Sequence, residues 1–482
     1  MSMRRLCSAA SALRPGPVVD RLLSPALAGE RRAWDMHNRA VAQRDAGRDV
    51  LILSMGNPHH AVPTTALEGT IEALRRGEHG YVDAAGIHSL RTAIAAYQSR
   101  RIGGSSGAID AERVVVTQGC QNALYAVMAS LLSAGDEVLV PIPHYVTYPT
   151  TIAATGGRCV QVETSPEDGF RITASLLRRQ LTPRTRAVLL TTPCNPTGVC
   201  PTPAELSEIV EMCAEHSLAL ICDEVYSGME FDGSEHINPA SLPRGKEVTV
   251  SVGSCSKIFS MTGWRVGWMT SASKELCDGV VALNESMHFG LSPFVQSGAA
   301  DAMAELNVAA EERLVRNAEH ARRSEPLELD PLAVLYQSRR DALLTGLKNE
   351  RRGGSSSDEV EATGGASPST STSITDVDRF RGAMIVRPGL VCRAPDGGMF
   401  CMVDVRSSGV TDTRFAELLL ERHAISVLPA TAFGENAAGH VRIGLLASKD
   451  QMRHVGECVV QLAGQLVEEG GGGGGGGVVK NI

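Results

Sequence analysis

The strongest constraint on the fold is an alternation of strand-like and helix-like segments that begins at residue 113. The apolar runs RVVVTQG (113–119) and DEVLVP (136–141) flank the segment QNALYAVMASLL (121–132). Short β-branched and apolar runs predict buried strands, whereas apolar residues three and four positions apart predict a helix. Strands that alternate with helices predict βαβ units, and therefore a largely parallel sheet with helices on both faces.

The alternation continues through RAVLLTTP (186–193), TPAELSEIVEMCAEHS (202–217) and LALICDEVY (218–226). Thr202 stands three residues before Glu205, which is the spacing of a capping box, so we expect a helix to begin there. This part of the chain is typical of an α/β protein with a doubly covered sheet.

After about residue 330 the pattern changes to a helix, three shorter strands and a terminal helix. The expected strands are MFCMVDV (399–405), ISVLP (425–429) and HVRIGLL (440–446). This pattern predicts a second, smaller α+β domain. We assign residues 20–60 and 331–466 to the small domain and residues 61–330 to the large domain.

Three segments have the composition of tails or surface insertions. Residues 350–376 contain the stretch GGSSSDEVEATGGASPSTSTS, which offers almost nothing to a core, so we expect a disordered insertion. Residues 467–482 contain an uninterrupted glycine run and are expected to form a flexible tail. Residues 1–19 hold three arginines, several serines and no acid, which resembles a mitochondrial transit peptide; a plain N-terminal tail is the alternative.

Composition narrows the classes of function. The formal net charge of −8 argues against a nucleic-acid partner. No apolar run reaches the roughly 20 residues of a spanning helix, so no membrane association is predicted. The 12 cysteines are scattered and form no CxxC pair, which favours reduced thiols and argues against a metal site. We therefore expect a cytoplasmic protein, or a protein of the mitochondrial matrix if residues 1–19 are a transit peptide.

The stretch GSCSKIFSMTGWRVGW (253–268) follows the β-branched run at 248–252. This position places Lys257 just past the carboxyl end of a predicted strand, where open α/β sheets bind their ligands. A lone lysine in a loop is more often a solvated charge, and nearby glycines are often turn residues. The functional interpretation therefore depends on which other residues reach the same edge of the sheet.

Other predicted strand ends also carry polar groups. Asn195 lies in CNPTG, Asp223 and Tyr226 lie in DEVY, and Gly119 stands where a helix is expected to start. Each has a local structural explanation, namely a turn, a salt bridge or a tight loop. Together with Lys257, however, they bring an amine, a carboxylate, a carboxamide, a phenol and a helix N-terminus to one end of one sheet.

This set of groups matches the needs of pyridoxal phosphate, an aromatic aldehyde with a ring nitrogen and a phosphate arm. The amine of Lys257 can form a Schiff base with the aldehyde. A carboxylate at Asp223 would keep the ring nitrogen protonated and strengthen the ring as an electron sink. Asn195 and Tyr226 would donate hydrogen bonds to the phenolic oxygen of the ring.

The phosphate arm requires donors and positive charge. Arg265 offers a planar, permanently charged fork, and Ser254 offers a hydroxyl group. The backbone amides of Gly119, Cys120 and Gln121 are expected at a helix N-terminus, where an anion is favoured. One loop is therefore predicted to provide both the covalent attachment and the phosphate anchor.

The stretch SCSKIFSMTGWRVGW, with CNPTG and DEVY in the expected order, resembles the class I/II aminotransferases, which are fold-type-I pyridoxal-phosphate enzymes. The resemblance runs from about Trp34 to Ala447 and is interrupted at 306–330 and 350–386. It implies an α/β fold with a large, mostly parallel-sheet domain and a smaller α+β domain. Within the family, the segments beginning AWDMHNRAVAQRD, PDGGMFCMVDVR and ERHAISVLPATAF are most similar to bacterial arginine:pyruvate transaminases.

The resemblance also implies roles for residues outside the strand ends. Tyr145 corresponds to the aromatic residue that stacks on the cofactor ring, and Arg442 to the arginine that binds the α-carboxylate of the substrate. Gly56 corresponds to a glycine whose backbone assists that arginine. Tyr81 corresponds to a tyrosine that reaches the phosphate of the neighbouring subunit, which implies a homodimer. The sequence departs from the family at the lip of the substrate entrance, where His59 replaces an aspartate.

These features predict an aminotransferase that moves an amino group from an L-amino acid to a 2-oxo acid, pyruvate or 2-oxoglutarate, in a ping-pong cycle. Lys257, Asp223 and Tyr226 are the expected catalytic residues, with the freed amine of Lys257 as the general base. The substrate remains open between arginine:pyruvate-like and aspartate-aminotransferase-like choices. A carbon–sulfur β-lyase would use the same lysine and anchors. A noncatalytic regulator would add a DNA-binding module, and no basic helix-turn-helix segment is evident.

Overall fold

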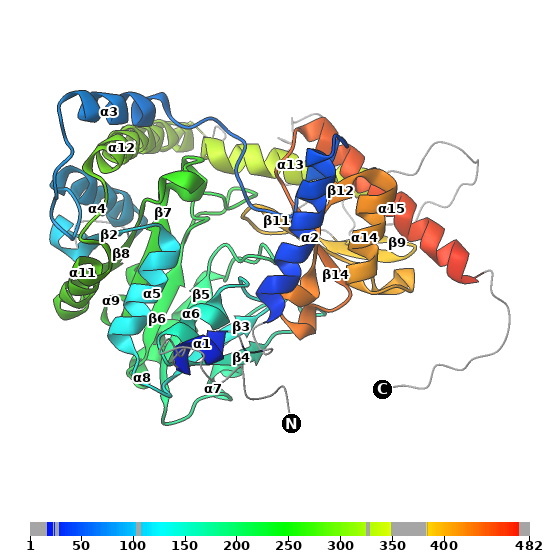
Figure 1. The fold of residues 1–482 in the computed structure, drawn as a ribbon, viewed down its shortest axis with the longest axis horizontal. Helices are drawn as coiled ribbons and strands as arrows, with labels where there is room; N and C mark the ends of the chain where they lie inside the picture. Colours follow the sequence, from blue (N-terminus) through cyan, green and yellow to red (C-terminus); the bar gives the residue numbers. More distant parts are fainter. Residues whose placement is uncertain are drawn as a thin grey trace, which may run out of the picture.

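The computed structural model describes residues 17–22, 24, 28–102, 108–323, 328–348, 382 and 384–471. Within them the chain forms a seven-stranded sheet, a five-stranded sheet and a two-stranded sheet. Figure 1 shows the large sheet and its helices on one side of the molecule and the two smaller sheets on the other. We call these parts the large unit and the small unit.

The large sheet has the order β2-β8-β7-β6-β5-β3-β4. Strands β4, β3, β5, β6 and β7 are parallel, and β8 lies antiparallel between β7 and β2. The strands are β2 (Val114–Thr117), β3 (Glu137–Ile142), β4 (Arg158–Glu163), β5 (Thr185–Thr191), β6 (Ala219–Asp223), β7 (Thr249–Ser254) and β8 (Gly267–Ser271).

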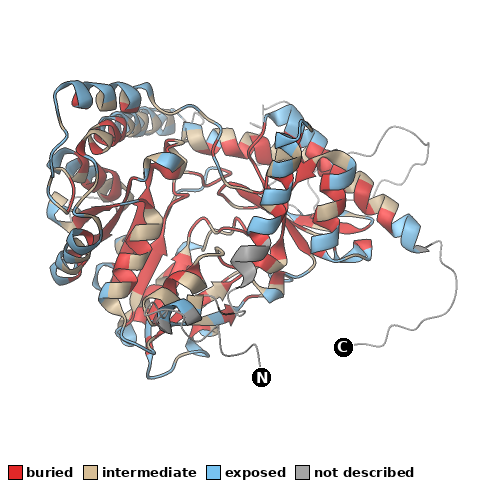
Figure 2. Ribbon diagram, viewed as in Figure 1, coloured by how far each residue is buried: buried red, intermediate tan, exposed pale blue. Residues whose placement is uncertain are grey.

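Helices cover both faces of this sheet because its strands bury both faces. On β6, Ile221 packs with the core beneath α5, whereas Leu220 and Cys222 pack with the core beneath α8. The helices of the large unit are α3 (Thr64–Arg75), α4 (His88–Ile102), α5 (Cys120–Leu131), α6 (Tyr148–Ala154), α7 (Ala174–Arg178), α8 (Pro203–Glu215), α9 (Gly245–Val248), α10 (Cys255–Ile258), α11 (Lys274–His288) and α12 (Pro293–Arg322). Figure 2 shows the strands as buried and the outer helix faces as exposed.

The register of the central strands aligns their carboxyl ends. Thr191 on β5 is paired with Asp223 on β6, and Asp223 is paired with Val252 on β7. On the other side of β7, Gly267 is paired with both Ser254 and Thr117. The loops that leave β2, β5, β6 and β7 therefore meet at a single edge of the sheet.

The small unit is assembled from both ends of the chain. Strand β1 (Leu51–Ile52) pairs in parallel with β12 (Ile425–Ser426), and the five-stranded sheet is antiparallel with the order β13-β14-β11-β10-β9. Its strands are β9 (Met384–Arg387), β10 (Leu390–Arg393), β11 (Phe400–Asp404), β13 (Leu428–Pro429) and β14 (His440–Gly444), and its helices are α2 (Ala28–Asp45), α13 (Pro331–Lys348), α14 (Asp412–His423) and α15 (Lys449–Gly471).

Several expectations about elements are confirmed. Thr202 caps α8 through the nitrogen of Glu205 and forms the predicted capping box. Lys257 lies in α10, directly after the carboxyl end of β7. The mostly parallel large sheet and the smaller α+β unit agree with the predicted fold class. The predicted domain boundaries at residues 60, 330 and 466 stay predictions.

Other expectations were wrong. The run ISVLP forms two strands, β12 and β13, because its halves pair with β1 and β14 in different sheets. The segment 17–19 belongs to helix α1 (Pro17–Leu22) rather than to a tail, since proline is favoured in the first turn of a helix. The expected tail from residue 467 is helical as far as Gly471, because α15 continues through Val467 and two glutamates. Residues 1–16 and 472–482 lie outside the described residues, as does the expected insertion at 350–376.

The described helices include none whose length and apolar character would suffice for a membrane crossing.

Candidate active site

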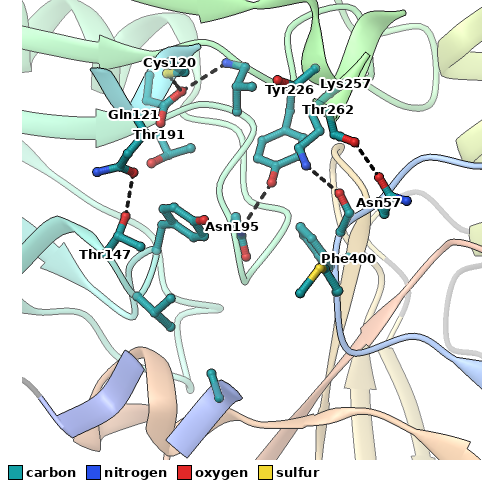
Figure 3. Close-up of a pocket in the computed structure, with 18 of the residues that line it drawn as sticks. Asn57, Cys120, Gln121, Thr147, Thr191, Asn195, Tyr226, Lys257, Thr262 and Phe400 are labelled. Atoms are coloured by element: carbon teal, nitrogen blue, oxygen red, sulfur yellow. Dashed lines mark hydrogen bonds between the residues drawn. The ribbon is translucent and has the colours of Figure 1, made fainter. Parts of the chain in front are cut away.

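A cavity of about 320 Å³ lies where the carboxyl ends of the large-sheet strands face the small unit (Figure 3). It brings together residues that are far apart in the sequence and that the sequence analysis singled out. The predicted site residues that line it are Gly56, Cys120, Gln121, Tyr145, Asn195, Asp223, Tyr226, Ser254, Lys257, Arg265 and Arg442.

Two predicted residues do not line this cavity. Gly119 is the N-cap of α5 and lies directly behind Arg265. Tyr81 is 87% exposed, and its ring lies against that of Phe289, with 5.0 Å between centroids. A tyrosine exposed on the surface cannot reach the cavity of its own chain, so its predicted role requires a second copy of the protein.

Lys257 points into the cavity from the short helix α10. Its Nζ donates a hydrogen bond of 2.5 Å to the carbonyl oxygen of Gly56 (Figure 3). Burial, together with the positive charge of Arg442, lowers the pKa of the Lys257 amine to about 8. A larger fraction of this amine is therefore neutral near pH 7 than for a solvated lysine, and only the neutral amine can act as a nucleophile or a base.

Asp223 ends β6 and is buried. Its Oδ2 accepts a 2.7 Å hydrogen bond from the hydroxyl of Tyr148, and its Oδ1 accepts from the amide of Val225 at 3.2 Å and from the thiol of Cys120 at 3.4 Å. Burial raises the pKa of Asp223, although these hydrogen bonds act in the opposite direction. No described residue forms an ion pair with Asp223, so a cation inside the cavity would complete its surroundings.

Arg442, Asn195 and Tyr226 form a connected polar chain. Arg442 Nη1 donates to Asn195 Oδ1 at 3.0 Å, and Asn195 Nδ2 donates to the hydroxyl of Tyr226 at 3.2 Å. The guanidinium lies between the rings of Phe400 and Phe433, 4.0 and 4.7 Å from their centroids. No carboxylate among the described residues pairs with Arg442.

The buried guanidinium is incompletely satisfied. Arg442 Nη2 donates to the carbonyl of Ser54, but Nε is buried without a hydrogen-bond partner in the part of the chain that the structure describes. Burial lowers the pKa of Arg442 to about 10, because removal from water disfavours the charged form. A bound carboxylate would provide the missing negative charge, and its planar shape matches the guanidinium fork.

The turn between β2 and α5 packs tightly against the start of β8. A Cβ atom added to Gly119 would lie 2.1 Å from Arg265 Nη2, and one added to Gly267 would lie 2.4 Å from the carbonyl carbon of Gly119. Arg265 also donates hydrogen bonds to the carbonyls of Thr262 and Gln118. The two glycines therefore allow the N-terminus of α5 and the Arg265 side chain to meet.

This turn has the chemistry of an anion site. The first amides of a helix have no partners within the helix, and here they lie beside Arg265, which lines the cavity. Ser254 caps α10 and contributes its hydroxyl to the same cavity. The donors at this end suit a phosphate, the carboxylate of Asp223 suits a protonated ring nitrogen, and the amine of Lys257 suits an aldehyde. The residues present therefore fit pyridoxal phosphate.

The sequence analysis missed several residues of the site. Tyr148 holds the carboxylate of Asp223, and Ser54 accepts from Arg442. Trp34 and His37 line the cavity from α2. Tyr148 lies three positions after Tyr145 and is the first residue of α6, and this spacing of aromatic residues was the available signal. The serine contributes a backbone carbonyl, which no residue pattern identifies.

A buried cluster supports the segment that carries Asp223 and Tyr226. His236 lies between Glu224 and Glu230, with nitrogen–oxygen distances of 3.1 and 3.0 Å. Burial opposes protonation of His236, but the hydrogen bonds to the two carboxylates outweigh it and raise the pKa of the imidazole to about 9. The segment 224–230 is therefore held at both of its ends by one histidine.

Among the described residues, no group of three or more histidine, cysteine, aspartate or glutamate side chains could hold a metal ion.

Comparison with known proteins places this chain in a family. The family model "Aminotransferase class I and II" matches residues 48–349 and 369–457. The arginine–pyruvate transaminase of Pseudomonas aeruginosa is 37% identical over 438 residues, which cover 90% of this chain and 96% of that protein. The aspartate/prephenate aminotransferase of Thermus thermophilus is 30% identical, with coverage of 89% of this chain and 94% of that protein.

The fold agrees with these matches. The structure of the aspartate aminotransferase from Thermus thermophilus with maleate superposes with a TM-score of 0.73 at 27% identity, and covers 93% of this chain and 99% of that chain. The match extends over most of this chain and nearly all of that one. The chain therefore belongs to the class I and II aminotransferases.

Proposed function

We propose that this aminotransferase uses pyridoxal phosphate to move an amino group from an L-amino acid to pyruvate or 2-oxoglutarate, with Lys257 as the residue that carries the cofactor. The observation that carries the proposal is the convergence of Lys257, Asp223 and Arg442 on one cavity. These three side chains supply an amine of lowered pKa, a buried carboxylate without an ion-pair partner and a guanidinium without a carboxylate.

The cofactor would be held at the edge of the large sheet. Arg265, Ser254 and the first amides of α5, at Cys120 and Gln121, would bind the phosphate, with Gly119 giving them room. Asp223 would face the ring nitrogen, Tyr145 would stack on the ring, and Asn195 and Tyr226 would hold the phenolic oxygen. When bound, pyridoxal phosphate supplies a carbonyl for the amino group and an electron sink for the α-carbon.

The substrate would be positioned by the small unit. Arg442 would bind the α-carboxylate bidentately, while the backbone at Gly56 forms the adjacent wall. This orientation would place the α-hydrogen of the donor near Lys257, whose amine would accept the proton and return it to the cofactor. The pKa of about 8 for this amine suits both directions of proton transfer near neutral pH.

The proposed working unit is a homodimer. Tyr81 lies far enough out on the surface to be available to a second copy, and it is 87% exposed. Apolar side chains on α3 are also exposed, with Leu67, Ile71 and Leu74 spaced so that they share one helix face. A contact between copies at this surface would cover the apolar stripe and bring Tyr81 to the neighbouring phosphate site.

A first experiment tests the transferase activity. Purified protein loaded with pyridoxal phosphate should convert pyruvate or 2-oxoglutarate into the corresponding amino acid when an L-amino donor is added. The absorbance of the cofactor should change in each half-reaction, because a ping-pong enzyme completes one half without the second substrate. If a cysteine conjugate instead gives pyruvate and a thiol without any acceptor, while no donor supports transfer, the protein is a β-lyase and the proposal is wrong.

A further inference from the structure

Part of the cavity wall is provided by α2 rather than by the strand ends. The helix is anchored by Ala33, Met36 and Ala40, which are buried in the small-unit core at spacings of three and four residues. Trp34 and His37 occupy the adjacent helix face and line the cavity. The orientation of α2 therefore fixes two large side chains at the site.

Trp34 is linked to the guanidinium of Arg442 by a chain of three contacts that runs through His37 and Ser54. Its ring meets the ring of His37 edge-on, with 5.8 Å between centroids, and His37 Nδ1 lies 3.0 Å from the hydroxyl of Ser54. The carbonyl of the same serine accepts a hydrogen bond from Arg442. The tryptophan ring thus lies on the side of the cavity where the α-carboxylate is proposed to bind.

The ring is only partly covered by the protein. Trp34 lines the cavity and is 46% exposed, so the protein leaves part of its ring free for contact with a ligand. Leu428 and Phe433, which also line the cavity, extend the apolar wall beside Arg442. Covering such a surface with an apolar side chain is favourable in proportion to the area removed from water.

The charged groups of the cavity lie elsewhere or are already used. The one carboxylate among the described lining residues is Asp223, whose two oxygens accept from three donors. Arg265 donates to two backbone carbonyls. Burial lowers the pKa of His37 and so favours its neutral imidazole. The wall around Trp34 therefore provides a planar apolar surface and neutral polar groups.

We propose that Trp34 selects the amino donor of the reaction proposed above, on which this inference rests. The ring packs against a large, uncharged donor side chain, so that aromatic and long aliphatic L-amino acids are preferred to aspartate and to arginine. A side-chain carboxylate finds no further cation at this wall among the described residues, and a guanidinium finds no carboxylate. Burying either charge there without a partner is unfavourable.

The inference is tested by binding, independently of turnover. Three carboxylic acids that lack an amino group share one carboxylate and differ at the other end: 3-phenylpropanoate, succinate and 5-guanidinopentanoate. Calorimetry on the cofactor-loaded enzyme should give a dissociation constant for 3-phenylpropanoate about tenfold or more below those of the other two, because a buried aromatic contact is worth this much. If succinate or 5-guanidinopentanoate binds most tightly, the inference is wrong.

Variants of α2 then identify the residue responsible. Trp34→Ala should weaken 3-phenylpropanoate about tenfold and leave succinate unchanged, whereas Trp34→Phe should retain most of the preference. Asn38 lies one turn further along α2, is exposed and does not line the cavity. Asn38→Ala should therefore change none of the three dissociation constants. An equal loss for all three acids in Trp34→Ala would overturn the role of the ring in selection.

The same enzyme separates this inference from the proposed function. If no L-amino donor supports transfer but 3-phenylpropanoate still binds more tightly than the other two acids, the proposed function fails. The preference of the cavity for an apolar side chain then stands. If transfer is found but aspartate or arginine is the best donor, the function stands and the inference fails.

Discussion

The guanidinium of Arg442 donates a hydrogen bond of 3.0 Å to the side-chain oxygen of Asn195, and so joins the small unit to the large unit across the cavity. Asn195 uses its amide nitrogen to reach Tyr226, so the asparagine connects the proposed carboxylate-binding group with the proposed cofactor-binding phenol. This link holds the guanidinium in a defined orientation before any substrate is present.

Arg442→Lys should lower kcat/KM for all L-amino donors by a similar factor of about 10 to 100, because the variant keeps the charge but loses a paired, charged hydrogen bond. The affinity for pyridoxal phosphate should remain close to that of the unaltered enzyme. Steady-state kinetics with several donors and a cofactor titration make the measurement. Loss confined to donors with a side-chain carboxylate, or release of the cofactor, would contradict the role.

Lys257→Ala should bind pyridoxal phosphate without the attachment that borohydride fixes, and should lose at least about 10²- to 10⁴-fold in rate from the missing general base. Mass spectrometry of the reduced, digested protein locates the modified residue. Lys274 provides the control, because it is exposed and paired with Asp278, so Lys274→Ala should retain attachment and rate. A cofactor adduct on another lysine would exclude Lys257.

Asp223→Asn should weaken cofactor binding, and should slow removal of the α-hydrogen much more than attachment of the cofactor, because a neutral amide no longer favours a protonated ring nitrogen. Tyr148→Phe removes one of the hydrogen bonds to Asp223 and should cause a smaller change of the same kind. Exchange of the α-hydrogen in deuterated water measures its removal, and the absorbance of the cofactor measures its attachment. Equal losses in both steps would indicate a purely structural aspartate.

His236→Ala should destabilise the protein by about 3 to 5 kcal/mol, since two buried carboxylates would lose their shared partner. In the unaltered protein this contribution is fully present below pH 6.5 and is lost as the pH rises through about 9, because folding raises the pKa of His236. Urea unfolding at pH 6 and pH 10 should show a smaller pH dependence in the variant.

The exposed His216, at the end of α8, gives the control for this experiment. His216→Ala should keep the stability and the pH dependence of the unaltered protein. If His236→Ala retains the same loss of stability between pH 6 and pH 10, another group is responsible for it.

A mixture of Tyr81→Phe and Lys257→Ala subunits should contain heterodimers with one intact site, if Tyr81 serves the neighbouring subunit. One site then carries both lesions, and the other combines an unaltered lysine with an unaltered tyrosine. Heterodimers purified through two different affinity tags should show activity at one site per dimer. Activity no greater than that of Tyr81→Phe dimers would place the tyrosine outside the neighbouring site.

Much of this architecture is predictable because the strand ends carry short polar motifs. The sequence identifies Asn195, Asp223 and Lys257 because each follows a clear apolar run, and the parallel sheet then requires these ends to meet. Their roles at the site nevertheless stay predictions until the variants are measured.

The strands and site residues that the sequence does not predict lack such local motifs. Strands β9 and β10 are short and partly exposed, so MIVR and LVCR lack a distinct apolar run. The contribution of Ser54 to the site arises from a backbone carbonyl that follows β1, whose position depends on its pairing with the distant β12. Trp34 lies on a helix whose orientation depends on contacts with residues almost 400 positions away, around η9 (Ala430–Phe433). Such long-range contacts leave no local pattern in the sequence.

The division of the site between two units bears on how an enzyme of this kind can diversify. The proposed cofactor anchors follow strands of the large sheet, whereas Trp34, Gly56 and Arg442 belong to the small unit, which the two ends of the chain build together. Under the proposed role of Trp34, substitutions on α2 would alter which amino donor is accepted without disturbing the turn where Gly119 and Gly267 meet. New substrate preferences can accumulate at one side of the cavity while the catalytic chemistry is inherited unchanged at the other.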